Sequence, residues 1–370
     1  MDQEMKKPAA EETASRKKPV RKHRWYFYVG IVLLVLVILA GGFLGYMTVT
    51  EYRPQQQEPA EAGGSESGVP YGGEPLRILT FNTGYGGLGR ESDFLMDGGK
   101  GTGAEDEETV RKNIQGIRNI LKKADADIYM LQEVDKHSGR TFYINELEEY
   151  EAELPEYSRY YAPNYICNFV PYPLQDPIGR VYSGVATYSR FQVTSAVRES
   201  LPVPFSWPIR TANLKRCLLV SRIPIEGSDK ELVIINLHLE AYDDGEGKIA
   251  QTRQLIDTLE AEYAKGNYVI AGGDFNQIFP DADNIVKDSS YWVPGRLETL
   301  PEEWRYEYDH VSPTCRLLNQ PLDPEDPLTQ YYTIDGFILS PNIEVSHIET
   351  MDEHFEFSDH NPVVMDVVLK

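Results

Sequence analysis

Acidic, amide and imidazole side chains recur along this chain where apolar segments end or begin. Carboxylate and amide oxygens suit Mg²⁺ or Mn²⁺, whereas imidazoles and further carboxylates can transfer protons. Together these residue types indicate metal-assisted hydrolysis of a phosphate ester. The set comprises Asn82, Glu133, His238, Asp274, Asn276, Asp335, Asp359 and His360.

The stretch FSDHNPVVMDVV, residues 357–368, contains the most conspicuous pair, Asp359 and His360. Pro362 fits the first residue of a strand, where no ladder hydrogen bond is lost. The apolar run that follows, interrupted only by Asp366, predicts a strand. The pair therefore lies on the loop that leads into a rigid strand, where functional residues concentrate. Taken alone, a surface turn with a solvated acid explains it equally well.

The other candidates follow the same rule. The pattern predicts strands over residues 76–84, 126–135, 182–190, 216–225, 231–241, 267–277, 333–340 and 363–369. Val110, Ile114, Ile117 and Leu121 repeat at helical spacing, and a second helix is predicted over residues 248–263, before Gly266. Strands that alternate with helices predict sheet layers covered by helices.

The N-terminal region predicts a membrane anchor. Residues 1–24 hold eight Lys and Arg against four Asp and Glu, and residues 25–47 hold no charged side chain. A run of that length can cross a bilayer as a helix, with its basic side in the cytoplasm. A cleavable signal peptide is the alternative, but its apolar core is usually only about 7–15 residues long. We predict a basic cytoplasmic tail (1–24) and a transmembrane helix (25–47).

Residues 48–75 are rich in Pro, Gly, Gln and Glu, which predicts a flexible linker. Residues 76–370 form the predicted catalytic domain, placed outside the cytoplasm by a single span in the cell membrane. Beyond the basic tail, 28 Lys and Arg stand against 54 Asp and Glu, a net charge of −26. Such a surface repels polyanions unless a cation intervenes. The three cysteines are too few and too scattered to predict a disulfide framework or a zinc site. A single disulfide bond between two of them is compatible with a location outside the cell.

Seven short motifs carry a family resemblance across residues 76–370. In order they are FNTG, LQEVD, YSGVATYSR, NLHLEA, GGDFN, IDGFILS and SDHNPVV. The chain resembles the endonuclease/exonuclease/phosphatase superfamily, which includes DNase I-like nucleases, bacterial sphingomyelinases and inositol polyphosphate phosphatases. The resemblance implies an α/β fold, a DNase I-like four-layer α/β/β/α sandwich with two packed sheets. With the N-terminal helix, it suggests a membrane-anchored, bacterial-type member.

The resemblance also implies a metal side of the site. Glu133 would be the metal carboxylate for Mg²⁺ or Mn²⁺, assisted by Asn82 and Asp359. Asp274 would activate or align the attacking water, and Asn276 beside it would hold the phosphate.

On the other side, the resemblance implies that His238 binds or polarises a non-bridging phosphate oxygen. His360 would be the imidazole at the scissile phosphate, oriented by Asp335. Tyr182 matches a tyrosine that some nuclease members use on the phosphate, although other branches place different residues there.

These roles predict a metal-dependent phosphodiesterase that acts outside the cell. The alternatives are an extracellular DNase-type endonuclease, or a phospholipid or inositol phosphate phosphatase. A non-catalytic surface module is expected to have lost Glu133, Asp274 or His360, and this chain has kept all three. The predicted partners are a phosphate-ester substrate (lipid head group, small diester or nucleic acid) and the membrane. The sequence indicates no protein partner.

Two further features admit two interpretations each. Arg210, Lys215, Arg216 and Arg222 form a basic stretch that either pairs with structural acids or binds phosphate. The aromatic residues of 157–172 form either a substrate wall or part of the core.

Overall fold

A computed structural model describes residues 24–65, 69, 71–243, 245–282, 290–298, 300–301, 303–326 and 329–370. The chain divides into two compact units, Met1–Val49 and Thr50–Lys370. Residues 1–23 of the predicted basic tail lie outside the described residues.

The first unit contains one long helix, α1 (Arg24–Val49). Its stretch Trp25–Val49 has a mean hydropathy of 2.8 over the most apolar window, and none of that window is buried by protein. Its length and composition suffice to cross a membrane, as the sequence predicts for residues 25–47. Signal sequences near an N-terminus share this length and composition.

Among the described residues, the second unit contains two mixed sheets of seven strands each. The first sheet consists, in spatial order, of β1 (Gln57–Pro59), β7 (Ser195–Ser200), β8 (Cys217–Pro224), β9 (Glu231–His238), β10 (Tyr268–Asp274), β16 (Asp335–Leu339) and β13 (Arg305–Glu307). The second consists of β17 (Ile343–Thr350), β18 (Val363–Leu369), β3 (Leu76–Asn82), β4 (Ile128–Asp135), β6 (Gly179–Ser189), β5 (Ser158–Val170) and β2 (Glu61–Gly64). Two short pairs, β11 (Gln277–Ile278) with β12 (Gly295–Arg296) and β14 (Cys315–Arg316) with β15 (Tyr331–Tyr332), lie apart from these sheets.

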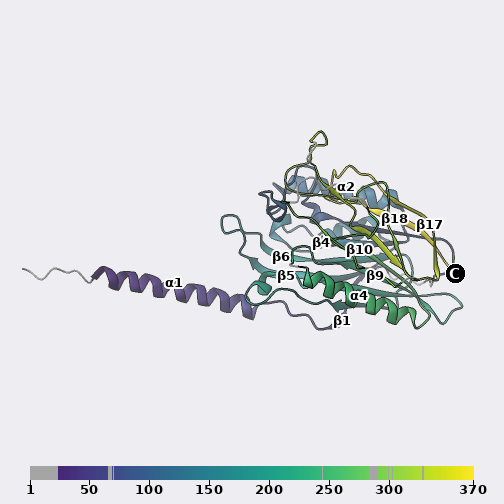
Figure 1. The fold of residues 1–370 in the computed structure, drawn as a ribbon, viewed down its shortest axis with the longest axis horizontal. Coiled ribbons are helices and arrows are strands. Elements are labelled where there is room, and N and C mark those ends of the chain that lie inside the picture. Colours follow the sequence, from purple (N-terminus) through teal and green to yellow (C-terminus); the bar gives the residue numbers. More distant parts are fainter. Residues whose placement is uncertain are drawn as a thin grey trace, which may run out of the picture. The chain divides into compact units, whose positions relative to one another are not determined.

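Helices cover the outer faces of both sheets. Helices α2 (Glu107–Ala124) and α3 (Glu146–Glu153) share a buried cluster with β3 and β4, whereas α4 (Glu246–Tyr263) packs on β8, β9 and β10. Between the sheets, Ile78 and Met130 of one meet Ile234 and Phe337 of the other. Helices α2 and α4 therefore lie on opposite sides of the strands (Figure 1). The predicted four-layer α/β/β/α sandwich is confirmed.

Local chemistry explains why α2 forms where it does. Asp106 caps its start by accepting a hydrogen bond from the backbone N–H of Thr109. Glu107 and Glu108 occupy the first turn and Lys122 and Lys123 the last, which matches the helix dipole at both ends. Short 3₁₀ turns connect other elements at Gly84–Gly86, Leu95–Asp97, Gly139–Thr141 and Ile209–Ala212.

The segment predicted as a flexible linker differs in the structure. Strand β1 pairs antiparallel with β7, and β2 pairs antiparallel with β5, so the segment completes one edge of each sheet. Tyr71 is fully buried and exchanges backbone hydrogen bonds with Pro224 and Glu226. Polar composition misled the prediction, because an extended polar chain can satisfy its backbone groups on an exposed sheet edge.

Strand β5 was not predicted, because Pro163 and two register shifts interrupt its alternation. Most of its aromatic side chains belong to the core: Tyr161 and Tyr165 are buried, as is the preceding Tyr157. Phe169 and Tyr172, in contrast, are exposed. Cys167, Cys217 and Cys315 are buried free thiols, so no disulfide bond joins any two of them.

Candidate active site

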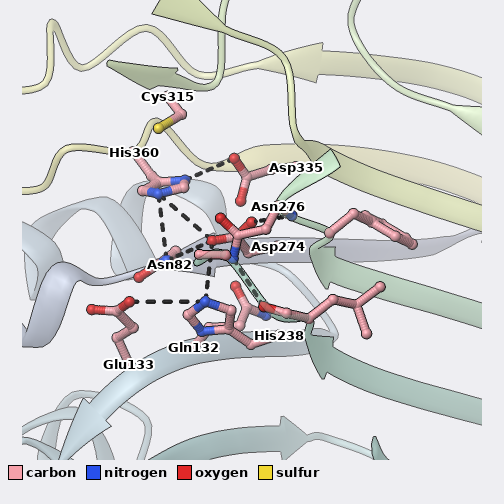
Figure 2. Close-up of polar contacts among 12 residues, drawn as sticks. Asn82, Gln132, Glu133, His238, Asp274, Asn276, Cys315, Asp335 and His360 are labelled. Carbon is pink, nitrogen blue, oxygen red and sulfur yellow. Dashed lines mark hydrogen bonds and ion pairs between the residues drawn. The ribbon is translucent and has the colours of Figure 1, made fainter. Parts of the chain in front are cut away.

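Strand register brings most of the candidate side chains together at one edge of the two sheets. Asn82 ends β3 next to Gln132 on β4. In the other sheet, Asp274 at the end of β10 pairs with His238 on the parallel strand β9 and with Asp335 on the antiparallel strand β16. The facing edges of the two sheets therefore form one polar cluster (Figure 2).

His360 and Asp335 form the tightest contact of this cluster. His360 Nδ1 lies 2.8 Å from Asp335 Oδ2, and both side chains are buried. The backbone of His360 is held by a β-bridge to Cys315. Burial alone lowers the pKa of His360, but the nearby carboxylates, Asp335 above all, outweigh it and hold that pKa well above the ordinary value. The charged form of His360 is therefore favoured, and in that form Nε2 can donate a hydrogen bond.

Asp274 lies at the centre of the cluster. Its Oδ1 accepts a hydrogen bond from the Asn276 backbone N–H at 2.8 Å, and its Oδ2 accepts one from Asn82 Nδ2 at 2.9 Å. The same Oδ2 lies 3.4 Å from His238 Nε2 and 3.7 Å from His360 Nε2. Burial, and then the charge of Asp335, raise the pKa of Asp274 to about 6. A carboxylate with such a pKa suits a general base near neutral pH.

Asn276 lies two residues beyond Asp274 in a left-handed conformation with φ of 50°. Asparagine tolerates this conformation better than most residues. Its side chain donates a hydrogen bond to the carbonyl of Leu239 at 3.0 Å. Asn276 therefore lies beside Asp274, held by the backbone that follows β9, and its role in holding the phosphate stays a prediction.

His238 is buried at the end of β9, and its Nε2 lies 3.9 Å from Glu133 Oε1. Burial, and next the charge of Arg216, hold its pKa well below the ordinary value. Its Nδ1 has no hydrogen-bond partner among the described residues. A neutral imidazole in this position can donate one hydrogen bond to a phosphate oxygen.

Glu133 and Asp359 form the more open part of the cluster. Glu133 has a φ of 54°, next to an irregularity in the pairing of β4 with β6, and a quarter of its side chain is exposed. Burial raises the pKa of Glu133. Burial also raises the pKa of Asp359 to about 7, where His360 opposes the shift and Glu133 adds to it. A bound cation would reverse both shifts, because it stabilises the charged forms.

The donor set on this side fits a hard divalent cation. Glu133 and Asp359 supply carboxylate oxygens, and the Asn82 Oδ1 that accepts a hydrogen bond from Gly84 N at 3.1 Å keeps a second lone pair. A Cβ at Gly84 would lie 2.9 Å from Asp359 Oδ1, so this glycine lets the loop close on that carboxylate. Two compact ligand groups also occur in the described part: Asp274, Asp335 and His360, and Cys315, Asp359 and His360.

Tyr182 does not join this cluster. Its described contacts are with Ser138 through the backbone, with Lys136, 5.6 Å from the ring, and with Tyr161. Its ring packs against the hydrophobic core between α2, α3 and the sheet, which also contains Ala186 and Tyr188 of the same strand. Because alternate residues of a strand point to opposite faces, Tyr182 shares the helix-covered face with these neighbours.

Sequence reasoning missed the residues that hold the site together. Ser358 Oγ donates to the Asn82 carbonyl at 2.8 Å and accepts from the His360 backbone N–H at 3.2 Å. Gln132 Nε2 donates to Asn236 Oδ1 at 2.8 Å, which joins the two sheets beneath the cluster. The available signal was an amide inside an otherwise apolar strand, since such groups are buried only with partners.

The residues of the basic stretch differ in how closely acids pair with them. Arg222 pairs with Glu231 at 3.0 Å and with Glu262, so it is structural. Arg210 and Lys215 both lie near Glu51, at 3.2 and 3.5 Å. The guanidinium of Arg216 lies 3.8 Å from Glu240.

The chain is similar to known proteins both in sequence pattern and in fold. The family model described as Endonuclease/Exonuclease/phosphatase family matches residues 79–360. An endonuclease/exonuclease/phosphatase from Beutenbergia cavernae DSM 12333 superposes with a TM-score of 0.54 at 17% identity, covering 80% of this chain and 72% of its own. A humanized D. rerio TDP2 with 14 mutations gives 0.50 at 14%, covering 79% of this chain and 98% of its own. No curated protein matches the chain significantly.

Proposed function

This chain belongs to the endonuclease/exonuclease/phosphatase family, a family of phosphoesterases with the DNase I-like fold, and we propose that it is a metal-dependent phosphodiesterase acting outside the cell. One observation carries the proposal: the Asp335–His360 pair, closed at 2.8 Å, faces Asp274 across a buried polar cluster.

In the proposed mechanism, Asp274 takes a proton from the attacking water. The pKa of about 6 supports this role, because the carboxylate is ionised near neutral pH yet basic enough to accept a proton. Asn82 Nδ2 and the Asn276 N–H fix the orientation of its two oxygens. Water attacks phosphorus, the ester P–O bond breaks, and the leaving oxygen departs with the bond electrons.

His360 and His238 bind the phosphate in this proposal. His360, kept protonated by Asp335, donates from Nε2 to a non-bridging oxygen and offsets the charge that grows there. His238, whose neutral form is favoured by its lowered pKa, donates to a second oxygen. Because both rings are buried, these interactions act at low local dielectric, where they are stronger than in water.

Glu133, Asp359 and Asn82 would hold Mg²⁺ or Mn²⁺, which supplies Lewis-acid stabilisation of the phosphate oxygens when bound. These three residues offer oxygen ligands and no thiolate, which favours a cation that prefers oxygen. The raised pKa values of Glu133 and Asp359 show that the positive charges of the protein do not fully offset their burial. Tyr182 is not assigned a role, because its described contacts lie outside the cluster.

We further propose that α1 anchors the protein in the cell membrane, with residues 50–370 outside the cytoplasm. The length of α1 and its mean hydropathy of 2.8 support this arrangement. Protease treatment of intact cells should release the globular unit, whereas a protected unit would reverse the orientation.

Small or head-group diesters rank ahead of duplex DNA in this proposal, and the net charge of −26 beyond the tail carries the ranking. Long-range repulsion slows the encounter with a polyanion, most strongly at low ionic strength. An extracellular nuclease and a phospholipid or inositol phosphate phosphatase remain the alternatives.

A substrate panel tests the proposal directly. The full chain in detergent is assayed with Mg²⁺ on bis-p-nitrophenyl phosphate, sphingomyelin, phosphoinositides, DNA and RNA, with His360→Ala as the inactive control. Hydrolysis of diesters by the wild type alone supports the proposal. Plasmid cleavage far faster than that of every small diester, and faster still as salt is lowered, would contradict the ranking.

A further inference from the structure

A basic pocket lies at the N-terminal boundary of the globular unit, and none of the residues of the catalytic cluster lines it. It has a volume of about 290 Å³ and is lined by Glu51, Tyr52, Arg53, Arg210, Lys215 and Arg216, among others. Four of these side chains are cations and one is an anion. Glu51 lies 2.9 Å from Arg53 Nη2, 3.2 Å from Arg210 Nε and 3.5 Å from Lys215 Nζ. The pocket therefore has an excess of positive charge inside a strongly acidic domain.

Arg216 makes this pocket more than a set of structural ion pairs. Its side chain is 4% exposed, yet Nε and Nη1 have no hydrogen-bond partner among the described residues. Among the described residues its ion-pair partner is Glu240, whose Oε2 lies 3.8 Å away, beyond hydrogen-bond length, and is likewise without a hydrogen-bond partner. The charge of Arg216 also acts on His238 and Glu133 of the catalytic cluster. Buried charged groups normally satisfy their hydrogen bonds, so an unsatisfied guanidinium indicates a missing anionic ligand.

Lys215 supports the same conclusion. It is largely buried, and burial lowers its pKa, with Glu51 opposing the shift and Arg210 adding to it. A single carboxylate thus does not balance the cations around it. A phosphate group has several anionic oxygens and suits such a set of donors.

The β7–β8 loop, which supplies Val203, Arg210, Lys215 and Arg216 to the pocket, also carries exposed apolar side chains. Trp207 and Ile209 of this loop are 53% and 61% exposed. The β5–β6 loop carries two more, Tyr172 at 55% and Leu174 at 82%. The strand that precedes that loop is tied to the β7–β8 loop, because Tyr165 Oη donates to the Ala212 carbonyl at 2.8 Å. Aromatic and aliphatic side chains around basic groups are typical of surfaces that meet the lipid head-group region.

The short connection between α1 and the pocket indicates that the partner of this surface is a membrane. Helix α1 ends at Val49, and Glu51 is already buried in the pocket. Consecutive Cα atoms lie about 3.8 Å apart, so the Cα of Glu51 is within about 8 Å of the Cα of Val49 along the chain. When α1 spans a bilayer, this short connection allows the pocket to reach the bilayer surface.

We propose that this pocket binds the phosphate of an anionic membrane phospholipid, with Arg216 as its buried anchor and the Trp207–Ile209 loop in the head-group layer. The inference rests on the proposed membrane anchor and adds a lipid-binding site that is distinct from the catalytic cluster. The lipid is a ligand there and not a substrate. The globular unit would then be docked on the membrane in one orientation instead of swinging on a tether.

Thermal unfolding of the full chain in neutral detergent with EDTA, with every variant made on the His360→Ala background, tests the site without turnover of the lipid. Short-chain phosphatidylglycerol should raise Tm at lower concentrations than inorganic phosphate does, and phosphatidylcholine should act more weakly than phosphatidylglycerol. Arg216→Gln and Arg210→Gln should each raise the half-maximal phosphatidylglycerol concentration about tenfold, the scale of one charge-assisted hydrogen bond. Arg222→Gln is the matched control on β8, since its partners are Glu231 and Glu262, and it should keep the response of the parent protein even if its own Tm falls.

The outcomes separate cleanly. An identical phosphatidylglycerol response in the His360→Ala parent and in Arg216→Gln would overturn the proposal, as would no response in the parent. A response to inorganic phosphate alone would identify a site for soluble anions and overturn the lipid occupant. Failure of the anchor would appear separately, as release of the protein from membranes by alkaline carbonate, and failure of the proposed activity would appear only in the substrate panel.

Discussion

The two halves of the active-site cluster are built differently. Around His360, protein groups close the contacts themselves: Asp335 lies at 2.8 Å from the ring, and Asn82 donates to Asp274 at 2.9 Å. Around Glu133 and Asp359, the nearest imidazole nitrogens lie at 3.9 and 3.8 Å. The first half is preorganised by hydrogen bonds, whereas the second contains carboxylates that no imidazole nitrogen approaches within hydrogen-bond distance.

The pKa shifts express the same difference. Near His360 an opposite charge overrides burial, so the charged form is already favoured. At Glu133 and Asp359 burial prevails, and the charged forms are disfavoured in the protein alone. We therefore expect the contacts around His360 and Asp335 to persist when metal is removed, whereas the charge state of Glu133 and Asp359 should depend on a bound metal.

The largest expected effect is on the open half. EDTA should abolish phosphodiester hydrolysis, and Mg²⁺ or Mn²⁺ should restore it, with Ca²⁺ poorer because its coordination is larger and less strictly octahedral. The measurement is a rate assay on bis-p-nitrophenyl phosphate through a cycle of chelation and metal addition. Glu133→Gln should raise the Mg²⁺ concentration for half-maximal rate at least about tenfold, whereas Glu156→Gln on the exposed surface should not. Full activity after exhaustive chelation would refute the comparison.

The next effect is on the closed half. His360→Ala should lower kcat at least about 10²-fold, the scale of losing a positioned acid–base group, with the fold intact. His354→Ala serves as control, because that imidazole is 82% exposed and lies on the surface. Steady-state kinetics and circular dichroism check both variants. Near-normal turnover in His360→Ala would remove His360 from the mechanism.

A smaller effect should follow from Asp335→Asn. The substitution removes the charge that raises the pKa of His360, so that pKa should fall and the protonated imidazolium should be lost at lower pH. We expect kcat to drop about tenfold and its alkaline limb to move to lower pH. A pH profile of kcat tests this, and an unchanged alkaline limb would show that Asp335 does not set the charge of His360.

The smallest effect on activity should come from a charge pair outside the site. Burial opposes ionisation of Glu262, but hydrogen bonds from Arg222, Lys265 and Asn267 prevail and lower its pKa to about 2. A lowered carboxyl pKa stabilises the folded state above the unfolded value of about 4.3, and this stability is lost as pH falls toward about 2. Glu262→Gln should therefore lower the free energy of unfolding by about 1–3 kcal/mol at pH 7 and leave kcat unchanged.

Denaturant unfolding of Glu262→Gln and wild type at several pH values checks that prediction. The difference between the two proteins should shrink below pH 4 and be small near pH 2. A constant difference across this range, or a fall in kcat, would show that the pair does something other than stabilise the fold.

The sequence predicted the site well where side chains end regular strands. His238, Asp274 and Asp335 occupy positions set by the pairing of β9, β10 and β16, and alternation within apolar runs suffices to find such strands. Tyr182 was placed by motif similarity alone, and its neighbours on the helix-covered face show why motif order cannot establish contact.

Other features depend on pairings that local patterns do not reveal. Strands β1 and β2 pair with residues roughly 100 to 140 positions later, and their composition is that of a linker. Ser358 contacts Asn82 across 276 positions. Neither Ser358 nor Asn82 is marked by the residues around it as a contact of the other. For the same reason the sequence alone does not reveal that the Arg216 guanidinium lacks hydrogen-bond partners among the described residues, or that Arg210 pairs with Glu51.

The distance along the chain between Asn82 and His360 has a consequence for biosynthesis. The two side chains lie 3.4 Å apart but 278 residues apart in sequence, and β18, which follows His360, pairs directly with β3, which ends at Asn82. Ribosomes add about 5–20 residues per second, so these two parts of the site are made roughly 14 to 56 seconds apart. During that interval a nascent chain lacks the imidazole, and hydrolytic competence arises only after β18 has joined its sheet. Synthesis therefore separates the appearance of Asn82 from the completion of the cluster around it.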